Sequence, residues 1–493
     1  MTALNDATLA NLSTLLPGPH YDRSTVKTGI VHIGVGGFHR SHQAVYVDDL
    51  LNAGLVSDWG ICGVGLLPSD AHMRDVMAAQ DCLYTVVTKH ADGALEPRIV
   101  GSIVEYLFAP DDVAAVVEKM ADPGVRIVSL TITEGGYSLD GEGRFDHTTA
   151  AVAADLAPDA VPATAFGLIT EALARRRERG IDAFTVMSCD NIEGNGHVVE
   201  HVLTGFAKLK DAELGAWIAE HVRFPNSMVD RITPATTDDD RTELADRFGI
   251  GDGWPVVCEP FTQWVLEDNF GAGRPAFERV GVQVVDDVEP YELMKLRLLN
   301  ASHQSLAYPG YLSGYQYVHE TAQDPIFVRF LLDYMRIEAV PTLRPVPGID
   351  LDAYTDQLIE RFANPGVRDT VARLCANSSD MIPKFLLPVV RAQLDAGGPI
   401  ERAATALAFW ARYAQGTDEH GEPINVVDHR RDDVMAAAQR DVDEPGSFLD
   451  QPAVFAELGQ NPQLRKAFVE AVTQVRDIGV RATLARLTDQ PAG

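Results

Sequence analysis

A lysine, an amide and an imidazole lie close together in a segment that otherwise has the composition of a buried helix. Lys295, Asn300 and His303 fall between Met294 and Tyr308. The apolar residues of this segment include Leu296, Leu298, Leu299 and Leu306. At about 100° per residue, an α-helix places the three polar side chains within about 140° of one another. Polar groups in an apolar stripe are costly unless they are paired or functional.

These three residue types together could perform proton transfer at an oxygen atom. Desolvation disfavours the ammonium form, so a buried lysine can become a base near neutral pH. The alternative is a helix whose polar residues simply face solvent, and this segment alone does not decide between the two.

The composition excludes several classes of partner. The chain has 493 residues, 46% of them hydrophobic, and a formal net charge of -30. A charge of this sign argues against nucleic acid or an anionic membrane surface as the main partner. No apolar stretch approaches membrane-spanning length, and the N-terminus has no secretory pattern. We therefore expect a cytoplasmic protein, with the oligomeric state left open, a monomer included.

The five cysteines are predicted to be buried free thiols in a reducing compartment, because they are odd in number and widely spaced. They are Cys62, Cys82, Cys189, Cys258 and Cys375. No Cys-x-x-Cys pair occurs, which argues against a structural zinc site.

The order of apolar runs predicts two domains. Short strand-like runs alternate with amphipathic helices up to residue 286, which is typical of a doubly wound parallel sheet. One of these predicted strands covers residues 98–106. From residue 287 the pattern is mainly helical, with helices expected at 290–313, 366–377 and 462–488, among others. We predict an α/β Rossmann-type domain over 1–286 and a mainly α-helical domain over 287–493, with the active site at their interface.

A glycine-rich turn follows the first predicted strand. Gly34 and Gly36 match the first two glycines of a dinucleotide-binding fingerprint, while His39 occupies the place of the third. The first glycine permits a tight turn and the second allows backbone amides to approach a pyrophosphate. The strand–turn–helix context favours a nucleotide loop over a plain turn. The predicted contacts are Ile33, Gly34, Val35, Gly36, Gly37, Phe38, His39 and Arg40.

Asp70 follows the second predicted strand and could accept hydrogen bonds from the adenosine ribose. An acid at this point favours NAD over NADP, because a 2′-phosphate would meet a like charge. The alternative is that Asp70 only caps the next helix. Arg74 nearby leaves some tolerance for NADP open.

Six motifs in order resemble those of the long-chain polyol-specific dehydrogenases, the mannitol dehydrogenase family. They are Gly34–His42, Thr131–Tyr137, Ser188–Asn191, Asp230–Pro234, Gln263–Glu267 and Lys295–His303. The resemblance covers nearly the whole chain, and the missing third glycine is a trait of the family. It implies metal-free hydride transfer between NAD and a secondary alcohol or ketone.

The resemblance also implies the roles of individual residues. Lys295 would be the general acid/base, Asn191 and Asn300 would hold the reacting oxygen, and His303 would position substrate hydroxyls. Asp230 would belong to the same site. Arg373 is a candidate for binding substrate, and a plain surface charge is the alternative. One departure is Met381, which stands where the family usually has a substrate-side lysine.

Within the family, the segments Tyr317–Thr321 and Pro345–Asp350 favour the branch that interconverts D-mannitol and D-fructose. Fructuronate or tagaturonate reductase and D-arabinitol 4-dehydrogenase are the alternatives. A uronate needs a cation for its carboxylate, and the chain offers no obviously added one. A non-catalytic sugar-binding protein is a further alternative, which the intact set of Lys295, Asn300, His303 and Asn191 argues against.

One short pattern points to a different class of enzyme. His197, Glu200 and His201 have the spacing of an inverted zinc-peptidase motif, in which two histidines bind zinc and the glutamate is the base. Such a short pattern arises readily by chance, so we keep it as a remote alternative.

Overall fold

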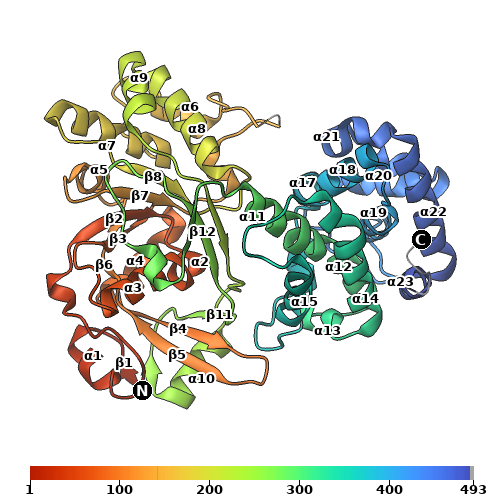
Figure 1. Ribbon diagram of the computed structural model, residues 1–493, viewed down its shortest axis with the longest axis horizontal. Coiled ribbons are helices and arrows are strands. Elements are labelled where there is room, and N and C mark those ends of the chain that lie inside the picture. The colour runs from red at the N-terminus through yellow and green to blue at the C-terminus, as the bar shows by residue number, and fades with distance from the viewer. Residues whose placement is uncertain (142, 489–493) are drawn as a thin grey trace. The chain divides into compact units, whose positions relative to one another are not determined.

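The computed structural model describes residues 1–141 and 143–488, and the chain divides into two compact units (Figure 1). The first unit is Met1–Glu289 and the second is Pro290–Gly493. The boundary expected after residue 286 lies close to this division.

The first unit is built on a five-stranded parallel sheet with the strand order β6-β3-β2-β7-β8. Its strands are β2 (Thr28–Ile33), β3 (Gly60–Gly65), β6 (Ile103–Phe108), β7 (Ile127–Leu130) and β8 (Thr185–Ser188). The chain runs outward from β2 through β3 to β6, then returns to place β7 on the other side of β2. This reversal creates a switch point at β2 and β7, where doubly wound sheets bind ligands. The predicted α/β class is confirmed.

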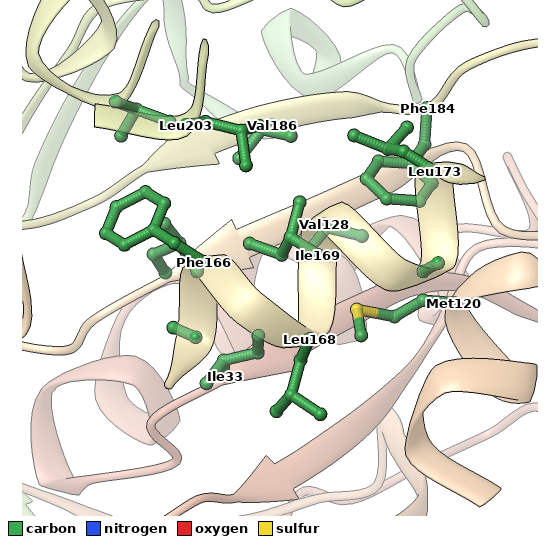
Figure 2. Packing of buried hydrophobic residues seen from close by; sticks show 14 of the residues in the cluster. Ile33, Met120, Val128, Phe166, Leu168, Ile169, Leu173, Phe184, Val186 and Leu203 are labelled. Carbon is green, nitrogen blue, oxygen red and sulfur yellow. The ribbon is translucent and has the colours of Figure 1, made fainter. Parts of the chain in front are cut away.

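Alternate residues of each strand face opposite sides of the sheet, and helices cover both sides. Val31 and Ile33 belong to one buried cluster, part of which Figure 2 shows, and Ile30 belongs to a second. The first cluster includes residues of α5 (Val113–Ala121), α7 (Ala165–Arg179), α8 (Asn195–Lys210) and α9 (Ala212–His221), and the second includes residues of α3 (Gln43–Asn52) and α4 (Ala71–Ala79). Burial on both faces explains why these strands read as continuous apolar runs.

The single strand predicted over 98–106 is wrong, because the chain changes sheets there. The observed strands are β5 (Leu95–Val100) and β6. Between them, the N–H of Gly101 donates to Asp48 Oδ1 at 3.0 Å and Ser102 Oγ donates to the Ala44 carbonyl at 2.6 Å. Both acceptors belong to α3, so tertiary contacts break the strand at a point where the apolar pattern continues.

Two small sheets and a two-stranded pair complete the strands of the first unit. The order β11-β4-β5 joins β11 (Val256–Cys258) and β4 (Tyr84–Lys89), and the order β13-β12-β9 joins β13 (Gln283–Val285), β12 (Gln263–Glu267) and β9 (Ser227–Asp230). The pair is β1 (Thr2–Ala3) with β10 (Ile250–Gly251). The remaining α-helices are α1 (Asp6–Leu12), α2 (Gly37–Ser41), α6 (Ala150–Asp155) and α10 (Asp238–Phe248).

Helices dominate the second unit, as predicted. They are α11 (Glu289–Met294), α12 (Ala301–Leu312), α13 (Val318–Ala322), α14 (Pro325–Asp333), α15 (Leu351–Phe362), α16 (Val371–Leu374), α17 (Ser378–Phe385), α18 (Leu387–Ala396), α19 (Glu401–Tyr413), α20 (Arg431–Asp443), α21 (Pro452–Phe455), α22 (Pro462–Ile478) and α23 (Val480–Thr488). The buried helix α19 packs against α12 and α22.

The three predicted helices named above differ from those observed. The helix expected at 366–377 is reduced to α16, and the one expected at 462–488 is broken between α22 and α23 by Gly479 with φ +81°. The helix expected at 290–313 contains a π-helical stretch, Lys295–Asn300, between α11 and α12.

All five cysteines are buried and none forms a disulfide, which confirms the prediction of free thiols. Among the described residues, no helix combines the length and apolar character needed to cross a membrane.

Candidate functional site

Four strands of the first unit end in register along one edge of the sheet. Ile33 pairs with Val64 and with Leu130, and Leu130 pairs with Ser188. Because the strands are parallel, the segments that follow these residues leave the sheet along the same edge. The glycine-rich turn, the Asp70 turn, the loop Thr131–Tyr137 and the Asn191 loop therefore share one side of the unit.

The glycine-rich turn is shaped by two glycines with different physical demands. Gly34 has φ +94°, and a Cβ added there would lie 2.2 Å from the carbonyl oxygen of Thr131. A Cβ added at Gly36 would meet no described heavy atom closer than 3.9 Å. The fold thus requires glycine at 34, whereas the space in front of Gly36 suits the close approach of a ligand such as a pyrophosphate.

His39 replaces the usual third glycine by stacking on the strand that precedes the turn. Its ring lies over His32 of β2, with centroids 3.4 Å apart and an interplanar angle of 11°. Burial lowers the pKa of His32 to about 3 and the pKa of His39 well below its usual value, so both rings are neutral at neutral pH. Two flat neutral rings allow the close helix–strand approach that a glycine otherwise permits.

Side chains from elsewhere in the unit brace the turn. The His32 ring lies 2.9 Å from Thr131 Oγ1, which donates to the Gly34 carbonyl at 2.7 Å. The guanidinium of Arg40 is fully buried, donates to the carbonyls of Gly36 and Trp254, and lies over the Trp254 ring. The Arg40 side chain therefore connects the glycine-rich turn to the segment around Trp254.

Asp70 lies just beyond β3, at the same edge of the sheet. Its Oδ2 accepts hydrogen bonds from the N–H groups of Leu66 and Leu67 at 2.9 and 2.8 Å. It makes no side-chain cap to α4, but its bond from the Leu67 N–H caps the 3-10 turn Pro68–Asp70 that leads into this helix, so the capping alternative holds for that turn. Arg74 forms ion pairs with Asp75 and Asp111 at 2.8 and 3.0 Å.

Asn191 follows β8 directly, and the peptide before it is held from two sides. The carboxylate of the buried Asp190 accepts from the N–H groups of Ile132 and Thr133 at 3.1 and 2.9 Å. Its carbonyl accepts from Asn195 Nδ2 at 3.1 Å. Burial raises the pKa of the Asp190 carboxyl group, while these donors act in the opposite direction.

Asp230 ends β9 and is buried. Hydrogen bonds of Asn195 and Arg231 link β9 to the loops and the helix at the edge of the five-stranded sheet. Asn195 donates to the Ser227 carbonyl at 2.7 Å, and Arg231 donates to the Ser41 carbonyl of α2 at 2.6 Å. Asp230 therefore stands on a strand bound both to the Asn191 loop and to the helix of the glycine-rich turn.

In the second unit, Lys295 and Asn300 are the first and last residues of the π-helical stretch. The N–H of Ala301 bonds to the carbonyl of Leu296, five residues back. An α-helix would set Lys295 and Asn300 about 140° apart, whereas the wider turn of a π-helix reduces this angle. Such π-turns occur frequently at functional sites.

The environment of this stretch is apolar, as the sequence predicts. Lys295 is 5% exposed, and Leu298 and Leu299 beside it are buried. Asn300 Oδ1 is buried and, among the described residues, has no hydrogen-bond partner. The His303 ring lies against Phe362 of α15, with centroids 4.6 Å apart. These facts contradict a helix whose polar residues face solvent.

Arg373 lies on α16, which packs against α12. Its guanidinium donates to both carboxylate oxygens of the buried Asp369, at 2.6 and 2.5 Å. This ion pair raises the pKa of Arg373 and fixes the plane of the guanidinium. Met381 lies on α17 and is partly exposed.

The inverted zinc-peptidase pattern forms no metal site in the described part of the chain. His197 and His201 lie on α8, where His201 Nε2 accepts from the N–H of Phe145 at 3.4 Å and His197 Nδ1 lies 3.5 Å from Asn226 Nδ2. Over residues 1–141 and 143–488, no group of three or more His, Cys, Asp and Glu side chains could hold a metal ion. Within these residues, the pattern therefore has no third protein ligand for a zinc ion.

Sequence reasoning missed the supporting roles of Asp190 and Asn195. The signal available for Asp190 is an acid directly after a buried strand, next to a predicted catalytic amide. Asn195 carries no such signal, because its partners are backbone groups of Asp190 and Ser227, distant in sequence.

Comparison with known proteins agrees with this geometry. The Mannitol dehydrogenase Rossmann domain matches residues 28–279, and the Mannitol dehydrogenase C-terminal domain matches residues 287–476. The chain is 45% identical to mannitol 2-dehydrogenase of Neosartorya fischeri, over 99% of both proteins. It is 47% identical to mannitol 2-dehydrogenase of Pyricularia oryzae, over 96% of this chain and 95% of the relative.

Two solved structures have the same fold over nearly the whole chain. Pseudomonas fluorescens mannitol 2-dehydrogenase, in a ternary complex with NAD and D-mannitol, has a TM-score of 0.92 and 46% identity over 99% of this chain and 100% of that one. Substrate-free D-sorbitol dehydrogenase has a TM-score of 0.89 and 37% identity, over 98% and 100%. Both domains are matched and the relatives are covered almost end to end, so the chain belongs to the mannitol dehydrogenase family.

Proposed function

We propose that the protein is an NAD-dependent mannitol 2-dehydrogenase that interconverts D-mannitol and D-fructose. The observation that carries this proposal is the full-length similarity, at 46% identity, to a mannitol 2-dehydrogenase whose structure contains NAD and D-mannitol. The buried Lys295 with Asn300 and His303 on one helical segment supports it, because these residues suit proton transfer at a hydroxyl.

The first unit binds the dinucleotide in this proposal. The turn at Gly34 and Gly36 accepts the pyrophosphate, and the first N–H groups of α2 have no partner within the helix and can donate to it. Asp70 accepts hydrogen bonds from the adenosine ribose. When bound, NAD supplies the acceptor for the hydride that leaves carbon.

The second unit supplies the base. Neutral Lys295 takes the proton of the C2 hydroxyl as the C2 hydride leaves, so that the C–O single bond becomes the carbonyl of fructose. In the reverse direction the ammonium returns this proton to the oxygen. Asn191 and Asn300 donate hydrogen bonds to the developing alkoxide, which offsets the lost solvation.

The remaining predicted residues orient the polyol. His303 and Arg373 bind hydroxyl groups other than the reacting one, and Asp230 takes part in the same reaction, as resemblance to the family implies. The Asp369 ion pair leaves the outer face of Arg373 in a fixed orientation for this task. Met381 offers no charge at the place where the family usually has a lysine, so the distal hydroxyls depend more on Arg373.

A spectrophotometric screen tests the substrate. NADH formation is measured with D-mannitol, D-arabinitol, D-sorbitol and D-mannonate at equal concentrations, and we expect the highest kcat/KM with D-mannitol. An inactive D-mannitol together with an active arabinitol or hexonate would assign the chain to another branch of the family. D-Sorbitol is the second candidate substrate, because of the similarity to D-sorbitol dehydrogenase. No turnover of any of the four would favour a non-catalytic binding protein.

Cofactor choice is a separate prediction. We expect kcat/KM to be higher with NAD than with NADP, since the Asp70 carboxylate would repel a 2′-phosphate. Asp70→Asn should reduce this preference by about tenfold, because a hydrogen bond to a charged group is lost together with the repulsion. Asp75→Asn is the matched control, as Asp75 lies on α4 and pairs with Arg74. Equal efficiency with both cofactors in the wild type would remove Asp70 from this role.

Metal independence is also expected, because the proposed mechanism uses a lysine where zinc enzymes use a metal-bound oxygen. Prolonged incubation with EDTA or phenanthroline should leave the rate of mannitol oxidation unchanged. Inactivation that added zinc reverses would contradict the lysine mechanism.

The proposed partners are a small polyol or ketose and NAD. Five buried free thiols suit a reducing compartment, and we place the enzyme in the cytoplasm.

A further inference from the structure

The buried carboxylate of Asp190 binds three donors from the loop Thr131–Tyr137. Oδ2 accepts from the N–H of Ile132 at 3.1 Å and from the hydroxyl of Tyr137 at 2.7 Å, and Oδ1 accepts from the N–H of Thr133 at 2.9 Å. The Asp190 residue is 8% exposed. All three donors lie beyond the end of β7 at Leu130, so this carboxylate shapes a loop and not the sheet.

Thr133 is held in a backbone conformation that β-branched residues avoid. Its φ is 60° and its ψ is 168°, a combination that is essentially restricted to glycine. Without a compensating interaction, the residue would relax to an ordinary extended conformation. Its N–H donates to Asp190 Oδ1, and its carbonyl accepts from the N–H of Gly136 at 3.1 Å. The bond to Asp190 is the one that ties this conformation to the residue before Asn191.

Tyr137 closes the loop on the same carboxylate. Its hydroxyl lies 2.7 Å from Ser188 Oγ as well as from Asp190 Oδ2. Burial, followed by the charge of Asp190, raises the pKa of Tyr137 well above its usual value, so the hydroxyl remains a donor. Both ends of the loop are thereby attached to the residue that precedes Asn191.

The backbone of Asp190 is fixed independently of its side chain. Its carbonyl accepts from Asn195 Nδ2, and Asn195 in turn binds both backbone groups of Ser227. The Asp190 carbonyl also accepts from the N–H of Ile192 at 2.9 Å, and the Asp190 N–H donates to Ser188 Oγ at 3.2 Å. The carboxylate links this residue to the strained loop, so its loss leaves Asp190 held by local contacts and by the contact to β9.

We propose that Asp190 is a positioning residue: by holding the strained loop at Thr133, its carboxylate orients Asn191 toward the reacting oxygen. This inference rests on the proposed function, since it uses the role assigned there to Asn191. A misplacement of a catalytic amide by about 1 Å can lower a rate by about 10²-fold.

The test begins with Asp190→Asn, which keeps the side-chain size but points an N–H donor at a group that already donates. We expect kcat for polyol oxidation to fall by about 10²-fold, with the dissociation constant of NADH unchanged, because the Thr131 contact to Gly34 remains. A matching loss of NADH binding would mean general damage to the sheet edge and would overturn the proposal.

A second substitution distinguishes a positioning role of Asp190 from a role in stability alone. Glycine adopts the Thr133 conformation without strain, so Asp190→Asn/Thr133→Gly should regain about tenfold in kcat, the effect expected from relieving such a residue. If Asp190→Asn does not fold, the double variant should fold. A double variant that is no better than the single one overturns the proposal.

Asp155→Asn is the matched control. Asp155 is also buried and also accepts from two backbone N–H groups and one hydroxyl, those of Ala163 and Thr164. We expect this variant to lose thermal stability while kcat stays near the wild-type value. Equal losses of kcat in the two variants would reduce Asp190 to a structural residue.

Amide hydrogen exchange of the peptides covering 131–137 and 190–194 keeps the inference separate from the proposed function. Faster exchange of both peptides in Asp190→Asn, reversed by Thr133→Gly, supports the inference. If the wild-type protein oxidised no polyol, the proposed function would fail. Amide hydrogen exchange would then be the only test of the inference about the loop. Unchanged exchange in Asp190→Asn overturns the inference whatever the activity.

Discussion

Replacement of Lys295 by alanine is expected to lower kcat for polyol oxidation by about 10²–10⁴-fold, the range typical of a removed general acid/base. Lys295 is 5% exposed and lies among leucines on the π-helical stretch that also contains Asn300. NADH binding should remain, since the glycine-rich turn belongs to the first unit. Steady-state rates and fluorescence titration with NADH measure the two quantities.

The pH dependence of the rate distinguishes a general base from a structural residue, because loss of a purely structural lysine would leave the shape of the pH profile unchanged. In the wild type, kcat/KM for oxidation should rise with pH as one proton is lost, and this step should vanish in Lys295→Ala. Primary amines added to the variant should restore part of the rate by replacing the missing amine. Lys295→Met, which keeps most of the apolar volume, should show the same loss if alanine destabilises the fold.

Lys89→Ala is the matched control for removal of a buried lysine. Lys89 is 8% exposed and forms an ion pair with Asp240 at 2.5 Å in the first unit. We expect this variant to lose stability and to keep its turnover. Near-wild-type turnover in Lys295→Ala would show that another residue is the base.

Replacement of Asn191 by alanine is expected to lower kcat by about 10²–10³-fold, the usual effect of removing one donor to a developing oxyanion. The loss should appear in kcat more than in KM, because the amide binds the oxygen most strongly when it carries charge. Initial-rate kinetics with D-mannitol and NAD give both parameters.

Glu193→Ala serves as the control on the same loop, since Glu193 is an exposed side chain two residues away. It should leave both kcat and KM near their wild-type values. A rise in KM at constant kcat in Asn191→Ala would mean that the amide binds ground state and transition state equally, and would contradict its assigned role.

Local pattern was sufficient for the architecture of this protein. Strands buried on both faces produce nearly continuous apolar runs such as Ile30–Ile33 and Ile127–Leu130, interrupted only by His32 and Ser129, and their alternation with helices predicts the doubly wound sheet. The change to a helical pattern after residue 286 likewise follows from local periodicity. The free thiols followed from number and spacing alone. These features depend on neighbours in sequence, which is why they could be predicted.

The same reasoning identified Lys295, Asn300 and His303 as polar residues in an apolar stripe, but with the wrong helical geometry. A period of 3.6 residues separates Lys295 from Asn300 around the axis, whereas the observed π-turn is wider and reduces this separation. The sequence carries no local signal for this wider turn, because packing within the second unit decides which backbone register is adopted. The assignment of each residue's chemical role came from resemblance to the family.

Only the tertiary structure decided the contacts that support the site. His39 fits the third glycine position because His32 of the preceding strand lies under it, and Asp70 holds the N–H groups of Leu66 and Leu67. The strand predicted over 98–106 divides because Asp48 and Ala44 bind the backbone there. Asp190 constrains Thr133, which is 57 residues away in sequence. Such partners are distant along the chain, and pairwise contacts of that kind leave no periodic trace in a single sequence.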